Sequence, residues 1–266
     1  MLTKSNRYQW RTSLRVSALG VVAALLLASA TTQAASGDRC REGGPQIFNS
    51  EWLPRTVATL ASHRPFKVVA IGSSSTQGYG ASEPRHAYPA QLAALLKLRF
   101  PQSAIRVANK GVGGEETAGM VARFERDVFA ERPDLVIWQT GTNDALQHIP
   151  VDRFAENLRR GIAELKAHGV DIILMTPQYA PEFNDVGSHA RYLAVMRSAA
   201  AEAHVPVFER FAMSKAWFFD RRFAEAPVLT ADGLHQSDVG YHCDALMLTD
   251  SLAAAVALPS KAAALQ

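Results

Sequence analysis

Short apolar runs alternate with longer amphipathic ones along most of the chain, and this alternation constrains the fold more than any other feature. Five short runs are predicted to be strands, at residues 67–71, 105–108, 134–139, 170–175 and 205–208. The middle runs are almost continuously apolar, which is typical of strands buried on both faces. Strict alternation of strand and helix predicts right-handed crossovers and a parallel sheet with helices on both faces.

The segments between these runs have helical spacing. Apolar residues recur at intervals of three and four over residues 151–165, and Gly169 follows, suited to the left-handed conformation at a helix C-terminus. Further helices are expected near residues 50–61, 88–100, 117–130, 189–203 and 237–256.

The first 34 residues predict a secretory signal peptide. Four basic residues precede an apolar run at 16–28, and small residues at 32–34 suit cleavage. The run is shorter than the roughly 20 residues that a spanning helix needs, and an uncleaved anchor is the alternative. The protein is therefore expected in the periplasm or outside the cell, without stable membrane insertion after cleavage.

Charge and composition exclude two classes of function. The whole chain has a formal charge of +3, and removal of the four leader charges leaves a charge near −1. With no basic run elsewhere, a nucleic-acid partner is not expected. The histidines and cysteines show neither H-E-x-x-H nor paired-cysteine spacing, so no metal site is expected.

The chain after the leader predicts one domain. Residues 35–64 form an N-terminal extension with a helix, residues 65–257 form the main domain, and residues 258–266 form a tail that frays. Two cysteines, Cys40 and Cys243, are present. In an exported protein they could form a disulfide, and two separate buried thiols are the alternative. The pattern carries no information on oligomeric state.

Residues suited to chemistry gather just after the predicted strands. Four such segments occur, at residues 72–78 (GSSSTQG), 109–114 (NKGVGG), 141–144 (GTND) and 232–235 (DGLH). Ligands bind at the carboxyl ends of parallel strands, so all four segments should open onto one site. Acyl transfer needs a serine, a base such as His235 and an orienting carboxylate such as Asp232. It also needs oxyanion donors, which a glycine loop and the Asn143 amide can supply.

These segments resemble the SGNH/GDSL hydrolase family. The first block of that family, Gly-Asp-Ser-x-x-x-Gly, fits residues 72–78 except that Ser73 replaces the aspartate. The glycine of the second block is matched best by Gly114. The third block, Gly-x-Asn-Asp, is matched by residues 141–144, and the last, Asp-x-x-His, by residues 232–235.

The resemblance extends from about residue 67 to 250. It implies a flavodoxin-like three-layer α/β/α sandwich with a mostly parallel five-stranded sheet, and an ester hydrolase without metal or cofactor. It makes Ser74 the nucleophile, His235 the base and Asp232 its orienting carboxylate. The oxyanion hole would comprise the N–H groups of Ser74 and Gly114 and the side chain of Asn143.

Some assignments stay open at this point. Ser73 and Ser75 are rival nucleophiles. The nucleophile elbow G-x-S-x-G is not met, because Thr76 stands where the second glycine should be, and this disfavours an ordinary α/β-hydrolase. Tyr179 and Phe183 lie on a long loop after the fourth strand and are candidate pocket walls. Asp144 is expected to brace its loop, and His148 and His242 are expected to be packing or surface residues.

The expected function is therefore an exported serine esterase that acts on short-chain or O-acetyl carbohydrate esters. A lipid esterase or lysophospholipase, and an acyltransferase of the same fold, are the alternatives within the enzyme class. A non-enzymatic flavin- or nucleotide-binding protein is the alternative outside it, because a hydroxyl-rich loop at a helix N-terminus also suits a phosphate.

Overall fold

The computed structural model describes residues 39–41, 46–181 and 186–258. These residues belong to one compact unit, Arg39–Gln266. The predicted signal peptide at 1–34 and the tail after Leu258 lie outside the described residues and stay predictions. Within the described ranges, no helix is both long and apolar enough to cross a membrane.

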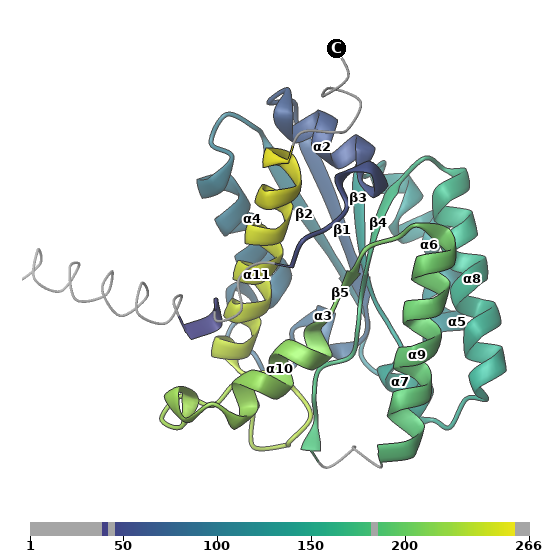
Figure 1. Cartoon of the computed structure of the whole chain (residues 1–266), viewed down its shortest axis with the longest axis vertical. Helices are drawn as coiled ribbons and strands as arrows, with labels where there is room; N and C mark the ends of the chain where they lie inside the picture. Colours follow the sequence, from purple (N-terminus) through teal and green to yellow (C-terminus); the bar gives the residue numbers. More distant parts are fainter. Residues whose placement is uncertain (1–38, 42–45, 182–185, 259–266) are drawn as a thin grey trace, which may run out of the picture. The chain divides into compact units, whose positions relative to one another are not determined.

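A five-stranded, wholly parallel sheet forms the middle layer (Figure 1). The strand order is β2-β1-β3-β4-β5, and each neighbouring pair is parallel. The predicted strands and the parallel sheet are confirmed, although β2 continues to Gly111 instead of ending at residue 108 and β5 comprises only residues 207 and 208 of the predicted 205–208. The strands are β1 (Phe66–Gly72), β2 (Ile105–Gly111), β3 (Leu135–Gln139), β4 (Asp171–Met175) and β5 (Val207–Phe208).

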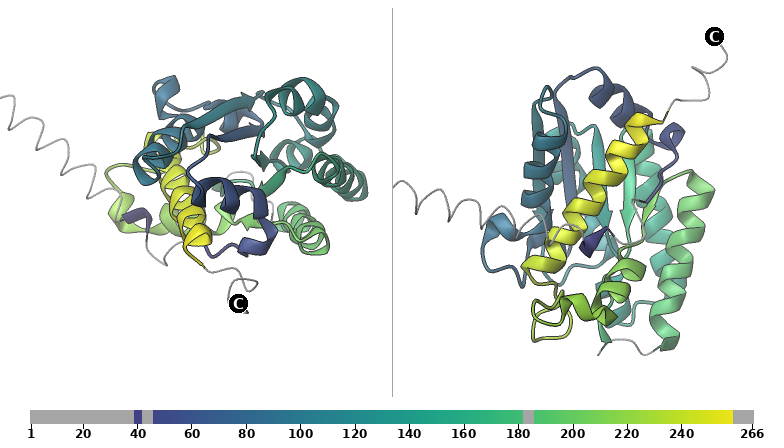
Figure 2. Two further views of the ribbon diagram at one scale, coloured as in Figure 1. Left: turned by 90° about the horizontal axis from the view of Figure 1, so that it is seen from above. Right: turned by 60° about the vertical axis from the view of Figure 1, so that its left-hand side comes forward.

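Helices cover both faces of this sheet, which confirms the three-layer sandwich (Figure 2). One core lies between the sheet and α2 (Pro54–Ala61), α4 (Tyr88–Arg99) and α11 (Asp238–Ala257). The other lies against α5 (Thr117–Ala122), α6 (Phe124–Asp127), α8 (Val151–Ala167) and α9 (Val186–Ala203). In β1, Val68 belongs to the first core and Val69 to the second. Alternate residues thus enter opposite cores, which is why the run is apolar at successive positions.

Three further helices lie at the carboxyl edge of the sheet, where the loops after the strands emerge. They are α3 (Ser74–Gln77), α7 (Thr142–Leu146) and α10 (Arg210–Phe219). Helix α8 ends where predicted: its last residue is Ala167, His168 is its C-cap, and Gly169 follows with φ of 67°. Helix α11 begins after Ser237, whose hydroxyl accepts a hydrogen bond from the N–H of Gly240.

The single helix predicted near residues 117–130 is wrong. Two short helices, α5 and α6, occupy this stretch and meet at Arg123, which has non-helical backbone angles (φ −111°, ψ 10°). The N–H of Arg123 bonds to the carbonyl of Met120 and closes the first helix early. The side chain of Arg123 lies buried against the carboxyl ends of β1 and β2, a tertiary contact that overrides the local helical pattern.

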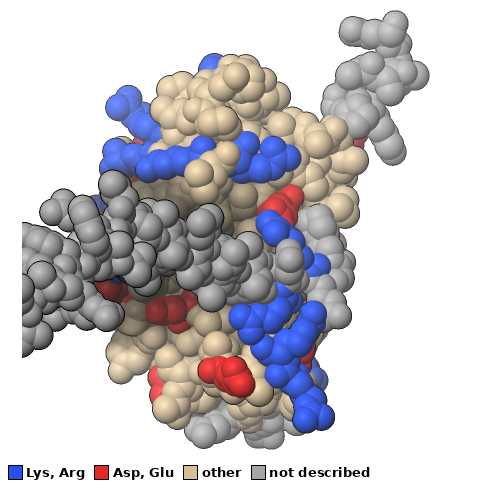
Figure 3. Space-filling model, turned by 90° about the vertical axis from the view of Figure 1, so that its left-hand side faces the viewer, with Lys and Arg blue, Asp and Glu red and all other residues tan. Residues whose placement is uncertain are grey.

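The side of the molecule that carries α4 and α11 has charges of both signs at its surface. Figure 3 shows Lys and Arg side chains in separate groups, with Asp and Glu side chains and uncharged surface between them. Asp250 of α11 forms an ion pair with Arg41 at 2.7 Å. Exposed pairs of this kind contribute little to stability.

A disulfide joins Cys40 to Cys243 in the structure. Both residues are almost completely buried, and the bond ties the segment before α2 to the second turn of α11. The two cysteines are 203 positions apart in the chain, so the bond closes a very long loop. Closing a loop of this length removes much of the conformational entropy of the unfolded chain.

The disulfide gives a prediction for stability. Replacing both Cys40 and Cys243 by serine should lower the free energy of unfolding by about 2–5 kcal/mol, because the unfolded chain regains its freedom. Urea titration followed by circular dichroism measures this difference, with thiol titration of the denatured parent as the control. Two reactive thiols in the parent, or equal stabilities of the two proteins, would contradict the pairing.

Candidate active site

Four segments meet at the carboxyl edge of the sheet, as the sequence predicts. They are the loop from β1 into α3, the loop at 112–116 after β2, the start of α7 after β3, and the segment 230–235 before α11. The first and last are joined directly by Ser74 and His235, which lie 161 positions apart in the chain. The sheet therefore brings together residues that are distant in sequence.

Ser74, His235 and Asp232 form a continuous hydrogen-bonded row. His235 Nε2 lies 2.9 Å from Ser74 Oγ, and His235 Nδ1 lies 2.6 Å from Asp232 Oδ2. The other oxygen of Asp232 accepts hydrogen bonds from the Thr230 hydroxyl and from the N–H groups of Leu234 and His235. Partial burial acts to raise the pKa of Asp232, but these bonds outweigh it and hold the pKa well below its usual range. The anion can keep Nδ1 protonated, which leaves Nε2 to accept a proton from Ser74.

The neighbouring serines are engaged elsewhere. Ser73 Oγ donates to Gln139 Oε1 at 3.1 Å, and Ser75 Oγ accepts from Arg210 Nη2 at 3.2 Å. Each of these two serines is only 2% exposed, whereas Ser74 is partly exposed. The geometry thus favours Ser74 over both rivals as the nucleophile, and it places a base, not a phosphate-binding group, against the hydroxyl.

Gln139, at the end of β3, holds the nucleophile loop in place through three hydrogen bonds. Its Oε1 accepts from the N–H of Ser73 at 2.9 Å, from Ser73 Oγ and from Thr76 Oγ1 at 3.1 Å. A Cβ at Gly72 would lie 2.2 Å from Thr76 Oγ1, so only glycine fits there. The serine at position 73 matches this arrangement, because a hydroxyl can donate to Gln139 Oε1 and an ionised aspartate cannot.

The candidate oxyanion donors lie on the next two loops. A Cβ at Gly113 would lie 3.9 Å from Ser74 Cβ, so the loop after β2 passes beside the nucleophile. Gly114 has φ of 77°, in the left-handed region that favours glycine, and its carbonyl accepts from Gln147 Nε2 at 2.8 Å. Asn143 Nδ2 donates to the carbonyl of Glu115 at 2.9 Å. The amide of Asn143 has two N–H bonds, so one can face a substrate while the other holds this contact.

Asp144 braces the same loops. Its carboxylate is fully buried and accepts hydrogen bonds from the N–H of Thr117 at 3.2 Å and from the Thr117 hydroxyl at 2.8 Å. Burial raises the pKa of Asp144.

The two other histidines near the motifs take no part in the row of Ser74, His235 and Asp232. His148 is exposed, and His242 Nδ1 lies 2.7 Å from Gln91 Oε1. Among the described residues, no three His, Cys, Asp or Glu side chains gather as a metal site would require.

Arg210, at the start of α10, is a site residue that the motifs do not indicate. It is fully buried, and its Nη2 donates to Ser75 Oγ and, at 2.8 Å, to Gln178 Oε1. Gln178 Nε2 in turn donates to the carbonyl of Leu234 at 2.8 Å. One guanidinium thus connects the nucleophile loop with the histidine loop. Asp244 lies 3.7 Å from Arg210 Nη1, and burial raises the pKa of Asp244 to about 7.

The aromatic residues near the site differ in exposure and in what their rings contact. The Tyr79 ring lies 4.4 Å from the His235 ring, centroid to centroid, and Tyr79 is 62% exposed, so it forms one wall of the site. Tyr179 is only 8% exposed, and its ring packs in a cluster with Phe211, Phe218 and Phe219. Phe183 lies outside the described residues, so its role as a pocket wall stays a prediction.

A cavity of about 320 Å³ opens next to the Tyr79 wall. It is lined by small or apolar residues and by three polar side chains: Gly80, Ala226, Pro227 and Val239, with Ser82, Ser237 and Asp238. Gly80 is packed closely against the histidine loop, because a Cβ there would lie 3.1 Å from His235 Cβ.

Comparison with known proteins identifies a family that this chain matches and several esterases that it resembles. Residues 40–258 match the model of the Non-GDSL lipase-like family. An acetylxylan esterase from Geobacillus stearothermophilus is 36% identical over 102 residues, which are 35% of this chain and 47% of that protein. An arylesterase from Vibrio mimicus is 28% identical over 132 residues, which are 48% of this chain and 64% of that protein. The chain thus matches about half to two thirds of the length of these relatives.

Solved structures share the fold. An acetyl-xylooligosaccharide esterase from Geobacillus, solved as a variant, superposes with a TM-score of 0.58 at 26% identity, over 73% of this chain and 95% of that one. A two-domain esterase active on acetylated mannans superposes with a TM-score of 0.66 at 21% identity, over 78% of this chain and 54% of that one. At 21% identity the second likeness concerns the fold alone.

Proposed function

Because the chain belongs to the Non-GDSL lipase-like family, we propose that it is an SGNH-type ester hydrolase, an exported serine esterase with Ser74 as its nucleophile. We propose O-acetyl groups on carbohydrate as its substrate. The observation that carries the catalytic assignment is the 2.9 Å contact of Ser74 Oγ with His235 Nε2, backed by Asp232 on the other ring nitrogen.

Acylation would proceed as follows in this geometry. Ser74 Oγ attacks the ester carbonyl carbon while His235 Nε2 takes the hydroxyl proton, and Asp232 stabilises the imidazolium. The carbonyl oxygen becomes an oxyanion, which the N–H groups of Ser74 and Gly114 and the Asn143 amide would bind. The tetrahedral intermediate then collapses, the bond to the alcohol oxygen breaks, and His235 returns the proton to that oxygen. An acyl-enzyme on Ser74 results.

Deacylation repeats these steps with water. His235 Nε2 takes a proton from a water molecule, whose oxygen attacks the acyl carbon. The second tetrahedral intermediate uses the same oxyanion donors. Its collapse releases the carboxylic acid and returns the proton from His235 to Ser74 Oγ, so the enzyme is regenerated without a cofactor.

Two observations support an acetylated carbohydrate as the substrate. One relative is an acetylxylan esterase, and one similar solved structure is an acetyl-xylooligosaccharide esterase.

The disulfide supports export. Cys40–Cys243 is buried and structural, and disulfides persist in oxidising compartments such as the periplasm or the extracellular space. The predicted leader at 1–34 agrees with this location.

An aryl- or lipid-ester hydrolase is the second candidate function. It is favoured by the likeness to the arylesterase, which extends over more of this chain than the likeness to the acetylxylan esterase. The same site could transfer the acyl group to a sugar hydroxyl in place of water, because the steps at Ser74 would be the same.

The catalytic assignment is tested by three serine variants. Ser74→Ala should lower kcat on 4-nitrophenyl acetate by at least about 10⁴-fold, because no nucleophile remains. Ser73→Ala and Ser75→Ala should keep more than about a tenth of the parent kcat, since their hydroxyls only brace the loop. Circular dichroism verifies that each variant is folded. A folded Ser74→Ala variant with parental activity would refute the assignment.

The substrate class is tested separately. The protein should release acetate from acetylated xylan and should prefer a two-carbon to an eight-carbon 4-nitrophenyl ester by at least about tenfold in kcat/KM. Acetate is measured by chromatography, with the Ser74→Ala protein as the blank. A preference for the eight-carbon ester without acetate release would instead favour the lipid-ester function.

A further inference from the structure

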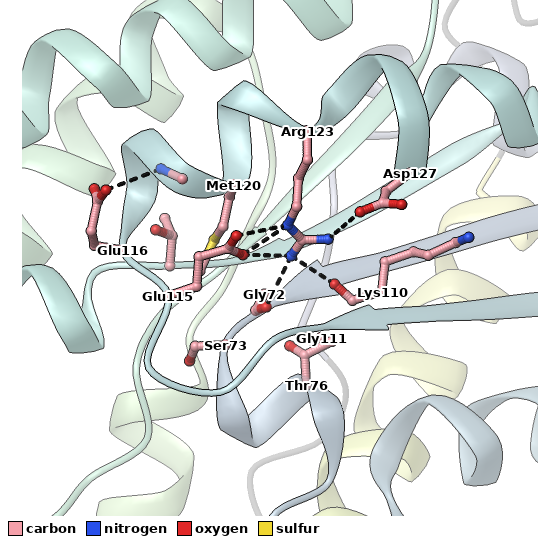
Figure 4. A network of polar contacts seen from close by, with 12 residues as sticks. Gly72, Ser73, Thr76, Lys110, Gly111, Glu115, Glu116, Met120, Arg123 and Asp127 are labelled. Carbon is pink, nitrogen blue, oxygen red and sulfur yellow. Dashed lines mark hydrogen bonds and ion pairs between the residues drawn. The ribbon is translucent and has the colours of Figure 1, made fainter.

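Arg123, which lies where α5 and α6 meet, holds three chain segments together (Figure 4). It is 8% exposed. Its Nη2 donates to the carbonyl of Lys110 at 2.8 Å and to the carbonyl of Gly72 at 3.4 Å, at the ends of β2 and β1. Its Nη1 donates to Asp127 Oδ2 at 2.9 Å. The two carbonyl contacts anchor the guanidinium to the ends of β1 and β2, and the Asp127 contact joins it to α6.

The remaining contacts of Arg123 hold Glu115 on the loop after β2. Nε donates to both carboxylate oxygens of Glu115, at 2.9 and 2.8 Å, and Nη2 approaches one of them at 2.6 Å. Charge-assisted, forked bonds of this kind fix both the position and the orientation of a carboxylate. The loop at 112–116 therefore has a fixed attachment to the sheet through one side chain.

Glu115 lies between the two candidate oxyanion donors that do not belong to the serine loop. It directly follows Gly114, whose N–H is one donor, and its own carbonyl accepts the hydrogen bond from Asn143 Nδ2 at 2.9 Å. This bond uses one amide hydrogen of Asn143 and so directs the other. A displacement of Glu115 would move the Gly114 N–H and rotate the Asn143 amide together.

We propose that Arg123 is a positioning residue for the reaction, which acts through Glu115 to set the Gly114 and Asn143 donors of the oxyanion hole. This inference rests on the proposed function. Arg123 does not act as an electrophile, because Nε and Nη2 are bonded to Glu115, Lys110 and Gly72, and Nη1 faces Asp127. Its charge is balanced by two carboxylates, so its effect is geometric.

The conservative variant Arg123→Lys tests this role. Lysine keeps the charge but cannot form the fork to Glu115, because it is a single donor point. Since the oxyanion is absent from the bound ester and develops only as the tetrahedral intermediates form, kcat and kcat/KM on 4-nitrophenyl acetate should fall together, by roughly 10- to 100-fold, with KM within about twofold of the parent. The pH at which kcat/KM is half-maximal should not move, because Arg123 has no contact with His235.

A double-mutant cycle identifies the route of the effect. Asn143→Ala alone should lower kcat by roughly 10²–10³-fold, and adding Arg123→Lys should then cost well under its own factor, because part of its effect runs through the missing amide. Glu115→Gln supplies an independent variant of the same contact, in case Arg123→Lys does not fold. It should lower kcat by about tenfold, again at unchanged KM.

Two matched controls separate positioning from general stability. Asp127→Asn removes the charge from the Arg123 contact that points away from the oxyanion loop, and Arg123 keeps its bonds to the carbonyls of Lys110 and Gly72. It should lower Tm but leave kcat within about twofold. Arg159→Lys changes an exposed arginine that pairs with Glu202 on the far helices and should change neither quantity.

A folded Arg123→Lys protein with parental kcat would overturn the inference while leaving the proposed function intact. So would losses that multiply fully in the double variant, or an Asp127→Asn variant that loses as much kcat as Arg123→Lys. If Ser74→Ala retained activity, the proposed function itself would fail.

Discussion

The hydrogen bond between Ser74 Oγ and His235 Nε2 is the contact on which the rest of the site depends. It joins a loop after the first strand to a loop before the last helix, across 161 positions of sequence. Neither loop could hold this geometry alone. The parallel sheet solves the problem, because the carboxyl ends of its strands all open on the same edge. The disulfide from Cys40 secures α11, the helix that directly follows the histidine loop.

Three buried polar side chains hold the loops that carry the reacting groups, either to the sheet or to one another. Gln139 holds the serine loop, Arg210 connects it to the histidine loop through Gln178, and Arg123 holds the loop with Gly114. Buried charges are costly unless they are well bonded, so they are weak candidates for simple stabilisers. Here they define the positions of the site loops to within hydrogen-bond tolerances.

Much of this architecture could be predicted from the sequence, because apolar periodicity reports burial and the four motif segments report chemistry. The strands, both helix layers and the meeting of Ser74 with His235 follow from those signals. Gln139, Arg210 and Arg123 could not be predicted, since their roles arise from neighbours distant in the chain. For the same reason one helix was expected where α5 and α6 break at Arg123. Choosing among Ser73, Ser74 and Ser75 needed the motif register, and the structure adds a physical reason for the choice.

Covalent labelling tests the central claim most directly. After reaction with a fluorophosphonate, which phosphonylates activated serines, the protein is digested and the labelled peptide is sequenced by mass spectrometry. The account predicts one label per chain, on Ser74, with hydrolysis of 4-nitrophenyl acetate lost in proportion to labelling. A label on Ser73 or Ser75, or full hydrolysis by a completely labelled protein, would contradict it.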